Sequence, residues 1–269
     1  MPTPAKMHRV HLSNVGEGIV YLPGGVPYQT DDEEVFPIGS FARFGRKGFV
    51  YAKSAGITNL SLGCKNSIHQ TISWSAIGAD AAIGDTQVTV TVGGTGGPSA
   101  DGTVAKDAYK GGEIMISPGG ATYTNRMSRG IIGNDVLAAA GDMVVYLDGP
   151  ITYALIEDTA VCEVMASPYS GVSTDIDGAH PVMGMATCIA ASGKYLWIQV
   201  EGLTGQVVCQ TDVGNTDHRG QCVFRSDGSI GPHDDADAME EYAQHAGFIP
   251  MLSPADTQGL PFVMLQIAH

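Results

Sequence analysis

The stretch 195–202 constrains the fold of this chain more than any other part of the sequence. It reads Tyr-Leu-Trp-Ile-Gln-Val-Glu-Gly, so it combines large apolar side chains with β-branched ones and ends on glycine. Such a stretch is typical of a central β-strand, in which Trp197 and Tyr195 pack on one face. The runs at 182–190, 206–211 and 221–225 are bounded by turn residues. The sequence therefore predicts an antiparallel meander around this strand.

Further strand patterns run along the chain. The strongest lies at 83–92, where threonine and valine alternate with a period of two and define one buried and one solvated face. Shorter patterns follow at 112–117, 143–147, 151–156, 161–165 and 261–267. Glycine (36 residues) and proline (14) are far above their usual combined share of roughly 12%, which indicates many turns between short strands. The chain is predicted to be all-β, with an antiparallel barrel or sandwich as its body.

Two segments do not fit this β-body. Residues 1–40 are rich in proline and glycine, which break helices, so we expect an extended N-terminal arm. Residues 235–246 carry acids in their first half and an apolar stripe, which predicts one short peripheral helix ending at Gly247. The predicted domains are an extended N-terminal arm and attachment segment over 1–70 and a β-rich body over 71–269, with a further division near residue 160.

The charge of the chain is unevenly distributed. The net charge is −14, yet no acid lies between Val35 and Ala79. This acid-free region holds the candidate partner-binding residues, which are Arg43, Phe44, Arg46, Lys47 and Lys53. A basic segment on an acidic body indicates docking onto an acidic partner, although five dispersed cations (the four named and Lys65) are a small footprint for nucleic acid. Two simpler explanations stay open, namely a strand with one buried face, and cations that are solvated or paired within the protein.

The five cysteines, at positions 64, 162, 188, 209 and 222, show neither a CxxC pair nor zinc-ligand spacing. Most lie in apolar, strand-like runs, so we expect free, buried thiols in a protein made in a reducing cytoplasm. No signal-peptide pattern and no apolar stretch of membrane-spanning length occur in the sequence, and we expect no membrane partner.

The patterns of common catalytic sites do not occur in the sequence. There is no GxSxG elbow, no HExxH pair and no dinucleotide fingerprint. Two acidic groups could hold a cation, one directly after His233 and one that begins at Asp175. Helix capping explains the first better than a bound cation, and a β-turn explains the second better. We therefore expect no catalytic residue, no metal site and no cofactor, in a protein that is not an enzyme.

Short motifs spread over roughly residues 40–267 form an ordered series. They are GFVYAKSAG at 48–56, GDTQVTVTV at 84–92, DAYKGG at 107–112, Tyr123 with Arg126, Gly133 with Asn134, LDGPI at 147–151, SPYSGV at 167–172, YLWIQVEG at 195–202 and SDG at 226–228. In this order the series resembles a group of virion proteins of tailed bacteriophages. The motif at 195–198 departs from the Tyr-Gly-Trp-x form of that group.

The resemblance implies a head decoration (capsid cement) protein. Such proteins bind the outside of the capsid and bridge neighbouring major capsid subunits, often as trimers. The implied partners are the major capsid protein and further copies of the chain, with no direct nucleic acid, on a virion assembled from protein made in the host cytoplasm. The alternative is a receptor- or glycan-binding tail or fibre protein, because this chain is longer than small cement proteins. That alternative needs an exposed aromatic groove on the body.

Overall fold

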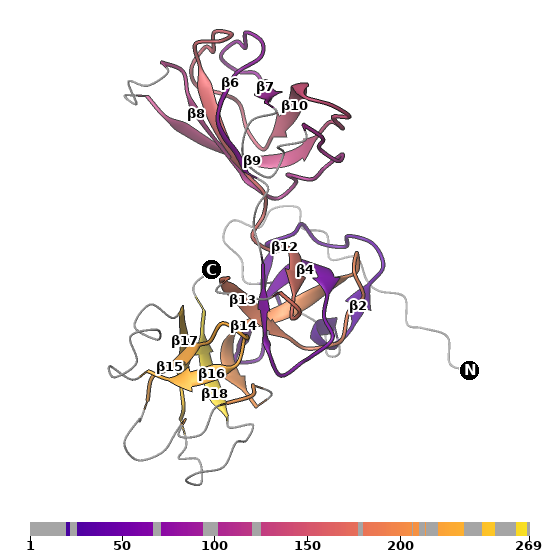
Figure 1. Ribbon diagram of the computed structural model, residues 1–269, viewed down its shortest axis with the longest axis vertical. Coiled ribbons are helices and arrows are strands. Elements are labelled where there is room, and N and C mark those ends of the chain that lie inside the picture. Colours follow the sequence, from indigo (N-terminus) through magenta and orange to yellow (C-terminus); the bar gives the residue numbers. More distant parts are fainter. Residues whose placement is uncertain are drawn as a thin grey trace, which may run out of the picture.

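The computed structural model describes residues 20–21, 26–66, 71–93, 102–119, 125–176, 180–205, 207–209, 213, 220–233, 244–250 and 262–267. Across these ranges the regular structure is β-strand, apart from a single 3-10 turn, η1 (Val26–Tyr28). The prediction of an all-β protein is confirmed. The strands form two sheets, which Figure 1 shows as separate parts of the molecule.

The larger sheet has twelve strands. They are β1 (Val20–Tyr21), β2 (Thr30–Asp31), β3 (Phe41–Phe44), β4 (Lys47–Gly56), β5 (Gly63–Lys65), β12 (Ser170–Ser173), β13 (Val182–Ala186), β14 (Tyr195–Thr204), β15 (Cys222–Phe224), β16 (Ile230–Pro232), β17 (Gln244–Phe248) and β18 (Val263–Gln266). β4, β12, β5, β13 and β14 pair in that order, and β14 pairs again with β4. These five strands therefore close a barrel, one of the two forms of body that the sequence predicted, in which β12 runs parallel to β4. We call this part of the molecule the main lobe.

The smaller sheet has six strands in the order β6-β11-β8-β9-β10-β7. They are β6 (Thr71–Ala76), β7 (Gln87–Val92), β8 (Glu113–Ser117), β9 (Met127–Asn134), β10 (Gly141–Leu147) and β11 (Val161–Met165). The sheet curls so that its two edge strands meet, because Ile77 bridges to Val90 and the Gly78 N–H donates to the Thr89 carbonyl at 2.9 Å. We call this part the insert lobe (upper part of Figure 1).

The two lobes have separate hydrophobic cores, each built from the strands of its own sheet. The insert lobe lies between β5 and β12 in the chain, so the main lobe is assembled from segments on both sides of it. This division differs from the predicted boundary at residue 70. Residues 41–65 are not part of an arm, because β3, β4 and β5 pair within the main sheet. Residues 1–19 of the predicted arm lie outside the described residues.

β14 is the central strand of the main lobe. It pairs with β2, β4, β13 and β18, and five consecutive residues from Leu196 to Val200 are buried. A strand with partners on both edges and cover on both faces needs apolar side chains in both registers, which explains the near-continuous apolar sequence. The predicted hairpin with β13 is confirmed. The predicted meander beyond it is wrong, since β14 continues into pairing with β18, and β15 pairs with β16 and β17.

Two other predicted elements differ from the structure. The run 151–156 is not a strand; Ile151 and Leu155 are buried, and Leu155 makes a single bridge to Ala81. The predicted helix at 235–246 falls mainly on residues outside the described ranges. Its last three positions, 244–246, belong to strand β17.

Trp197 lies in an aromatic cluster on one face of β14. Its side chain is 1% exposed and packs with buried Phe49 and Tyr51 from β4. The Phe36 ring lies 5.1 Å from Trp197 in an edge-on arrangement, and the Tyr51 ring lies at 5.0 Å. Among the described residues, no hydrogen-bond partner reaches the buried Nε1 of Trp197. The cluster joins β4, β14 and the segment before β3, so the prediction that Trp197 is a core residue is confirmed.

We expect Trp197→Ala to lower the free energy of unfolding by roughly 3–5 kcal/mol, because it leaves a cavity among these rings. Trp197→Phe is the matched control. It keeps an aromatic ring and removes an N–H that has no described partner, so its free energy of unfolding should fall clearly less. Urea denaturation of the three proteins measures the difference. An unchanged midpoint for Trp197→Ala would show that the cluster does not stabilise the main lobe.

Candidate functional site

The β3–β4 hairpin brings four of the five predicted partner-binding residues together. β3 and β4 pair from Phe41 with Val50 to Phe44 with Lys47, which leaves Gly45 and Arg46 as a two-residue turn. Gly45 has a φ of 62°, the left-handed conformation that such tight hairpin turns require and that glycine adopts without a steric penalty. Arg43, Phe44, Arg46 and Lys47 therefore lie at one tip. Lys53 lies six residues further along β4, about 20 Å away at the usual rise of a strand.

Three of the five predicted partner-binding residues contact other described residues of the protein itself. Arg43 pairs with Glu201 at 2.6 Å, and its guanidinium lies 5.7 Å from the Phe41 ring centre. The ammonium of Lys53 lies 5.7 Å from the ring centre of Tyr195. Phe44 packs edge-on against Tyr28 at 6.4 Å. These three residues have internal contacts, which favours the simpler explanation for part of the basic segment.

Arg46 and Lys47 are the outward-facing cations of the hairpin tip. Arg46 is exposed, and no described residue forms an ion pair with either side chain. Lys47 is half-buried, and this desolvation lowers its pKa from the ordinary value. A partially desolvated cation is stabilised by an acidic group brought close to it. The tip therefore suits contact with an acidic partner.

The backbone of the tip is docked on β14. Gly202 of β14 has a φ of 93°, and a Cβ atom added there would lie 2.6 Å from the Arg46 carbonyl oxygen. Glycine at this position thus permits a backbone approach that no other residue allows. The Arg43–Glu201 pair lies beside the same contact. Arg46 is consequently presented from a fixed backbone, which reduces the ordering cost of binding.

The acidic segment before β3 is tied to both lobes. Tyr51 donates its hydroxyl to Asp31 Oδ2 at 2.7 Å, and Lys194 pairs with Asp32 at 2.6 Å. The hydrogen bond from Lys194 lowers the pKa of Asp32. Lys110 of the insert lobe pairs with Glu34 at 3.0 Å. These contacts hold residues 31–34 across the main lobe and join them to the insert lobe.

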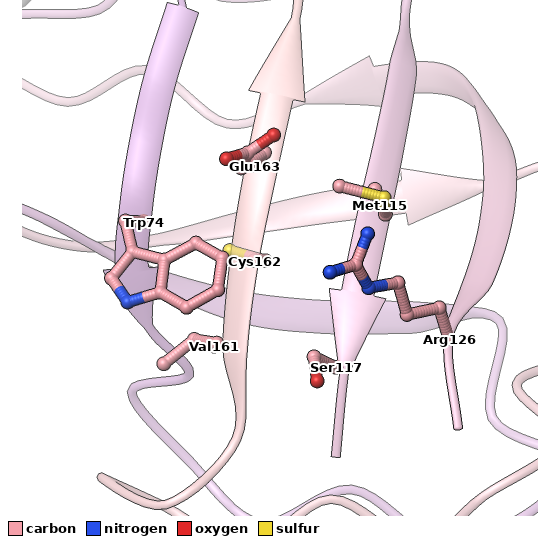
Figure 2. A pocket seen from close by; sticks show the side chains of 7 residues that line it. All are labelled: Trp74, Met115, Ser117, Arg126, Val161, Cys162 and Glu163. Atoms are coloured by element: carbon pink, nitrogen blue, oxygen red, sulfur yellow. The ribbon is translucent and has the colours of Figure 1, made fainter. Parts of the chain in front are cut away.

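A second site, which sequence reasoning missed, lies on the outer face of the insert lobe. A shallow hollow is lined by Trp74 of β6, Met115 and Ser117 of β8, Arg126, and Val161, Cys162 and Glu163 of β11 (Figure 2). Trp74 is 42% exposed, in contrast to Trp197. The space that the hollow encloses is about 10 Å³, far below the roughly 300–1,000 Å³ of pockets that enclose small molecules, so only one face of a ligand can rest on it.

A β-bulge sets the position of Trp74. Cys162 pairs with Ser75 and Val164 with Ile72, so Ser73 and Trp74 together lie opposite Glu163. Trp74 itself has a φ of 53°, which bulky side chains rarely adopt and which costs of the order of 1–3 kcal/mol. Simple alternation would place Trp74 on the same face as the buried Ile72. The bulge instead turns the indole outward, and for that reason no periodicity in the sequence could have revealed it.

The cysteines do not contribute to either site as nucleophiles. All five are free, and Cys64, Cys162, Cys209 and Cys222 are buried whereas Cys188 is half-buried. Burial raises the pKa of the four buried thiols from 9.0 to about 12 and raises that of Cys188 to a smaller extent. Protonated, buried thiols are poor nucleophiles.

We expect the four buried thiols to be unreactive toward a thiol-specific reagent at pH 8 in the folded protein, whereas Cys188 reacts slowly and all five react in urea. The folded pKa values lie above the unfolded ones, so the thiols contribute stability below pH 9 that is lost as the pH rises from 9 to about 12. Labelling followed by mass spectrometry measures the reactivity of each thiol. Rapid native labelling of Cys64 or Cys222, or a melting temperature that depends on reductant, would contradict the burial.

We also searched the described residues for metal-ligand clusters and for membrane-spanning helices. In the part of the chain that the structure describes, no three His, Cys, Asp or Glu side chains gather as metal ligands would, and no helix has the length and apolar character of a membrane span. Comparison of the chain with protein-family models, with curated proteins and with solved structures found no match.

Proposed function

We propose that this chain is a capsid decoration protein of a tailed bacteriophage, which binds the outer shell and bridges major capsid subunits. The proposal starts from the ordered series of motifs that resembles phage virion proteins. It assigns the protein to the virion exterior, with the major capsid protein and further copies of the chain, as a homotrimer, as its partners. The role is non-catalytic and needs no cofactor.

The hairpin tip is the observation that carries the proposal. A chain of net charge −14 presents Arg46 and Lys47 from a turn whose backbone is docked on its central strand. Complementary charge steers association and fixes the orientation of a complex. An acidic surface on the shell is therefore the partner that the tip fits best. Arg43, Phe44 and Lys53 support the hairpin from within the main lobe and make a smaller direct contribution.

The two-lobed architecture supports a bridging role. Each lobe has its own core, and the Glu34–Lys110 pair joins them. One lobe can therefore bind the shell while the other extends from it. Weak contacts that are repeated around a symmetric shell gain strength through avidity, so each tip needs to contribute only a modest affinity.

We expect Arg46→Glu to weaken binding to purified heads that lack the protein by about tenfold, because it places like charges at the contact. Lys106→Glu is the matched control: it makes the same charge change on an exposed residue of the insert lobe. Co-sedimentation at low and high salt measures both variants, and wild-type binding should weaken with salt. If both variants bind as the wild type does, the tip is not the attachment site.

A map of the particle at moderate resolution tests the location directly. Two-lobed density on the outer surface of the head, with the β3–β4 hairpin toward the shell, is the expected result. Density at the tail or fibre would instead assign the chain to the alternative class of receptor-binding proteins.

A further inference from the structure

The outer face of the insert lobe presents a flat aromatic surface with polar groups of both signs around it. In Figure 2, the Trp74 indole lies on the near side of the sheet, with the Glu163 carboxylate above it and the Arg126 guanidinium across β11 and β8. The register places Glu163 opposite Met115 on β8, and Val161 opposite Ser117. An exposed indole, a carboxylate, a guanidinium and a hydroxyl thus border one shallow hollow.

We propose that this hollow is a saccharide-binding site that takes one ring of a neutral oligosaccharide. A sugar ring has an apolar C–H face and a rim of hydroxyl groups. The indole supplies the flat apolar surface on which the C–H face can lie. Glu163 accepts hydrogen bonds from sugar hydroxyls, and Arg126 donates to their oxygens.

The balance of charge and the shape of the hollow indicate this class of ligand. One acid and one base border it, so it has no net preference for a cationic or an anionic ligand. Its floor consists of β6, β11 and β8, and β11 and β8 are paired on both edges. A peptide therefore cannot bind by adding a strand at these two positions. The hollow is shallow and open to solvent, so it can contact one face of a ring in a longer chain without enclosing it.

The backbone at Trp74 gives independent support. The bulge opposite Glu163 and the φ of 53° hold a large aromatic residue in a conformation that favours glycine or asparagine. Bulges at such positions re-aim side chains, and strained backbone concentrates at binding sites. The conformation places the indole at the surface, outside the buried cluster of the insert lobe. A binding role explains why tryptophan occupies this position.

The test uses the full-length protein and a panel of neutral oligosaccharides built from glucose, galactose, mannose and N-acetylglucosamine. Tryptophan fluorescence and saturation-transfer NMR detect binding, and the Trp197→Phe variant isolates the signal of Trp74. We expect at least one oligosaccharide to bind, with a tenfold or greater loss of affinity in Trp74→Ala and in Glu163→Gln. Trp74→Asn serves as a second variant, because asparagine tolerates the left-handed conformation and should leave the melting temperature unchanged or raise it.

Ile132→Ala is the matched control, since Ile132 is an exposed apolar residue of the same lobe that does not line the hollow. It should bind as the wild type does. The inference is overturned if no member of the panel produces a Trp74-dependent signal, if binding persists in Trp74→Asn, or if only charged peptides compete for the hollow. It stands apart from the capsid proposal: Trp74→Asn should still bind heads, and Arg46→Glu should still bind the oligosaccharide.

Discussion

The pairing of β4 with β14 is the interaction on which the rest of the main lobe depends. It joins residues 48–53 to residues 195–201 and closes the five-stranded barrel. The same pairing places Phe49 and Tyr51 against Trp197 and sets the hairpin tip against Gly202. Contacts between strands so far apart in sequence carry a large loop-closure cost, which the burial of the aromatic cluster offsets. The hairpin that we propose as the attachment element is therefore part of the barrel.

The charges of the N-terminal region divide between internal and external roles. Lys65 is buried and donates to the Ser226 carbonyl at 2.7 Å, while Arg43 and Lys53 contact Glu201 and Tyr195. The acids at 31, 32 and 34 also have internal partners. Among the described residues of this region, Arg46 and Lys47 are the cations that remain outward-facing. The lobes thus present two different surfaces, a basic tip on the main lobe and an aromatic hollow on the insert lobe.

Regular alternation allowed the sequence to predict several strands closely. β11 matches its predicted bounds and β7, β8 and β18 lie within four residues of theirs, because each has one buried face and a period of two. The run 151–156 has the same apolar character, but Ile151 and Leu155 are buried as single anchors of a loop. Composition alone does not distinguish these two cases.

The candidate sites were harder to predict for physical reasons. Proline and glycine made the N-terminal region appear to be a separate arm, whereas non-local pairing with β14 incorporates β4 into the barrel and β3 pairs beside it. The gathering of Arg43, Phe44, Arg46 and Lys47 needed only a local hairpin, so it followed from their proximity in sequence. The Trp74 hollow combines residues from β6, β8 and β11 and depends on a bulge. Neither the bulge nor the strand order of that sheet is encoded in a local pattern.

Amide hydrogen exchange of the intact protein tests the central claim most directly, namely that β4 and β14 form one barrel that holds the hairpin. Amides in the stable core of a protein exchange only through large-scale opening, whereas those of an arm exchange freely. The account predicts that peptides covering 48–56 and 195–204 are the slowest to exchange and share one rate, while the turn at 45–46 exchanges quickly. Fast exchange over 48–56 alongside a protected 195–204 would show that the segment is an arm and would contradict the account.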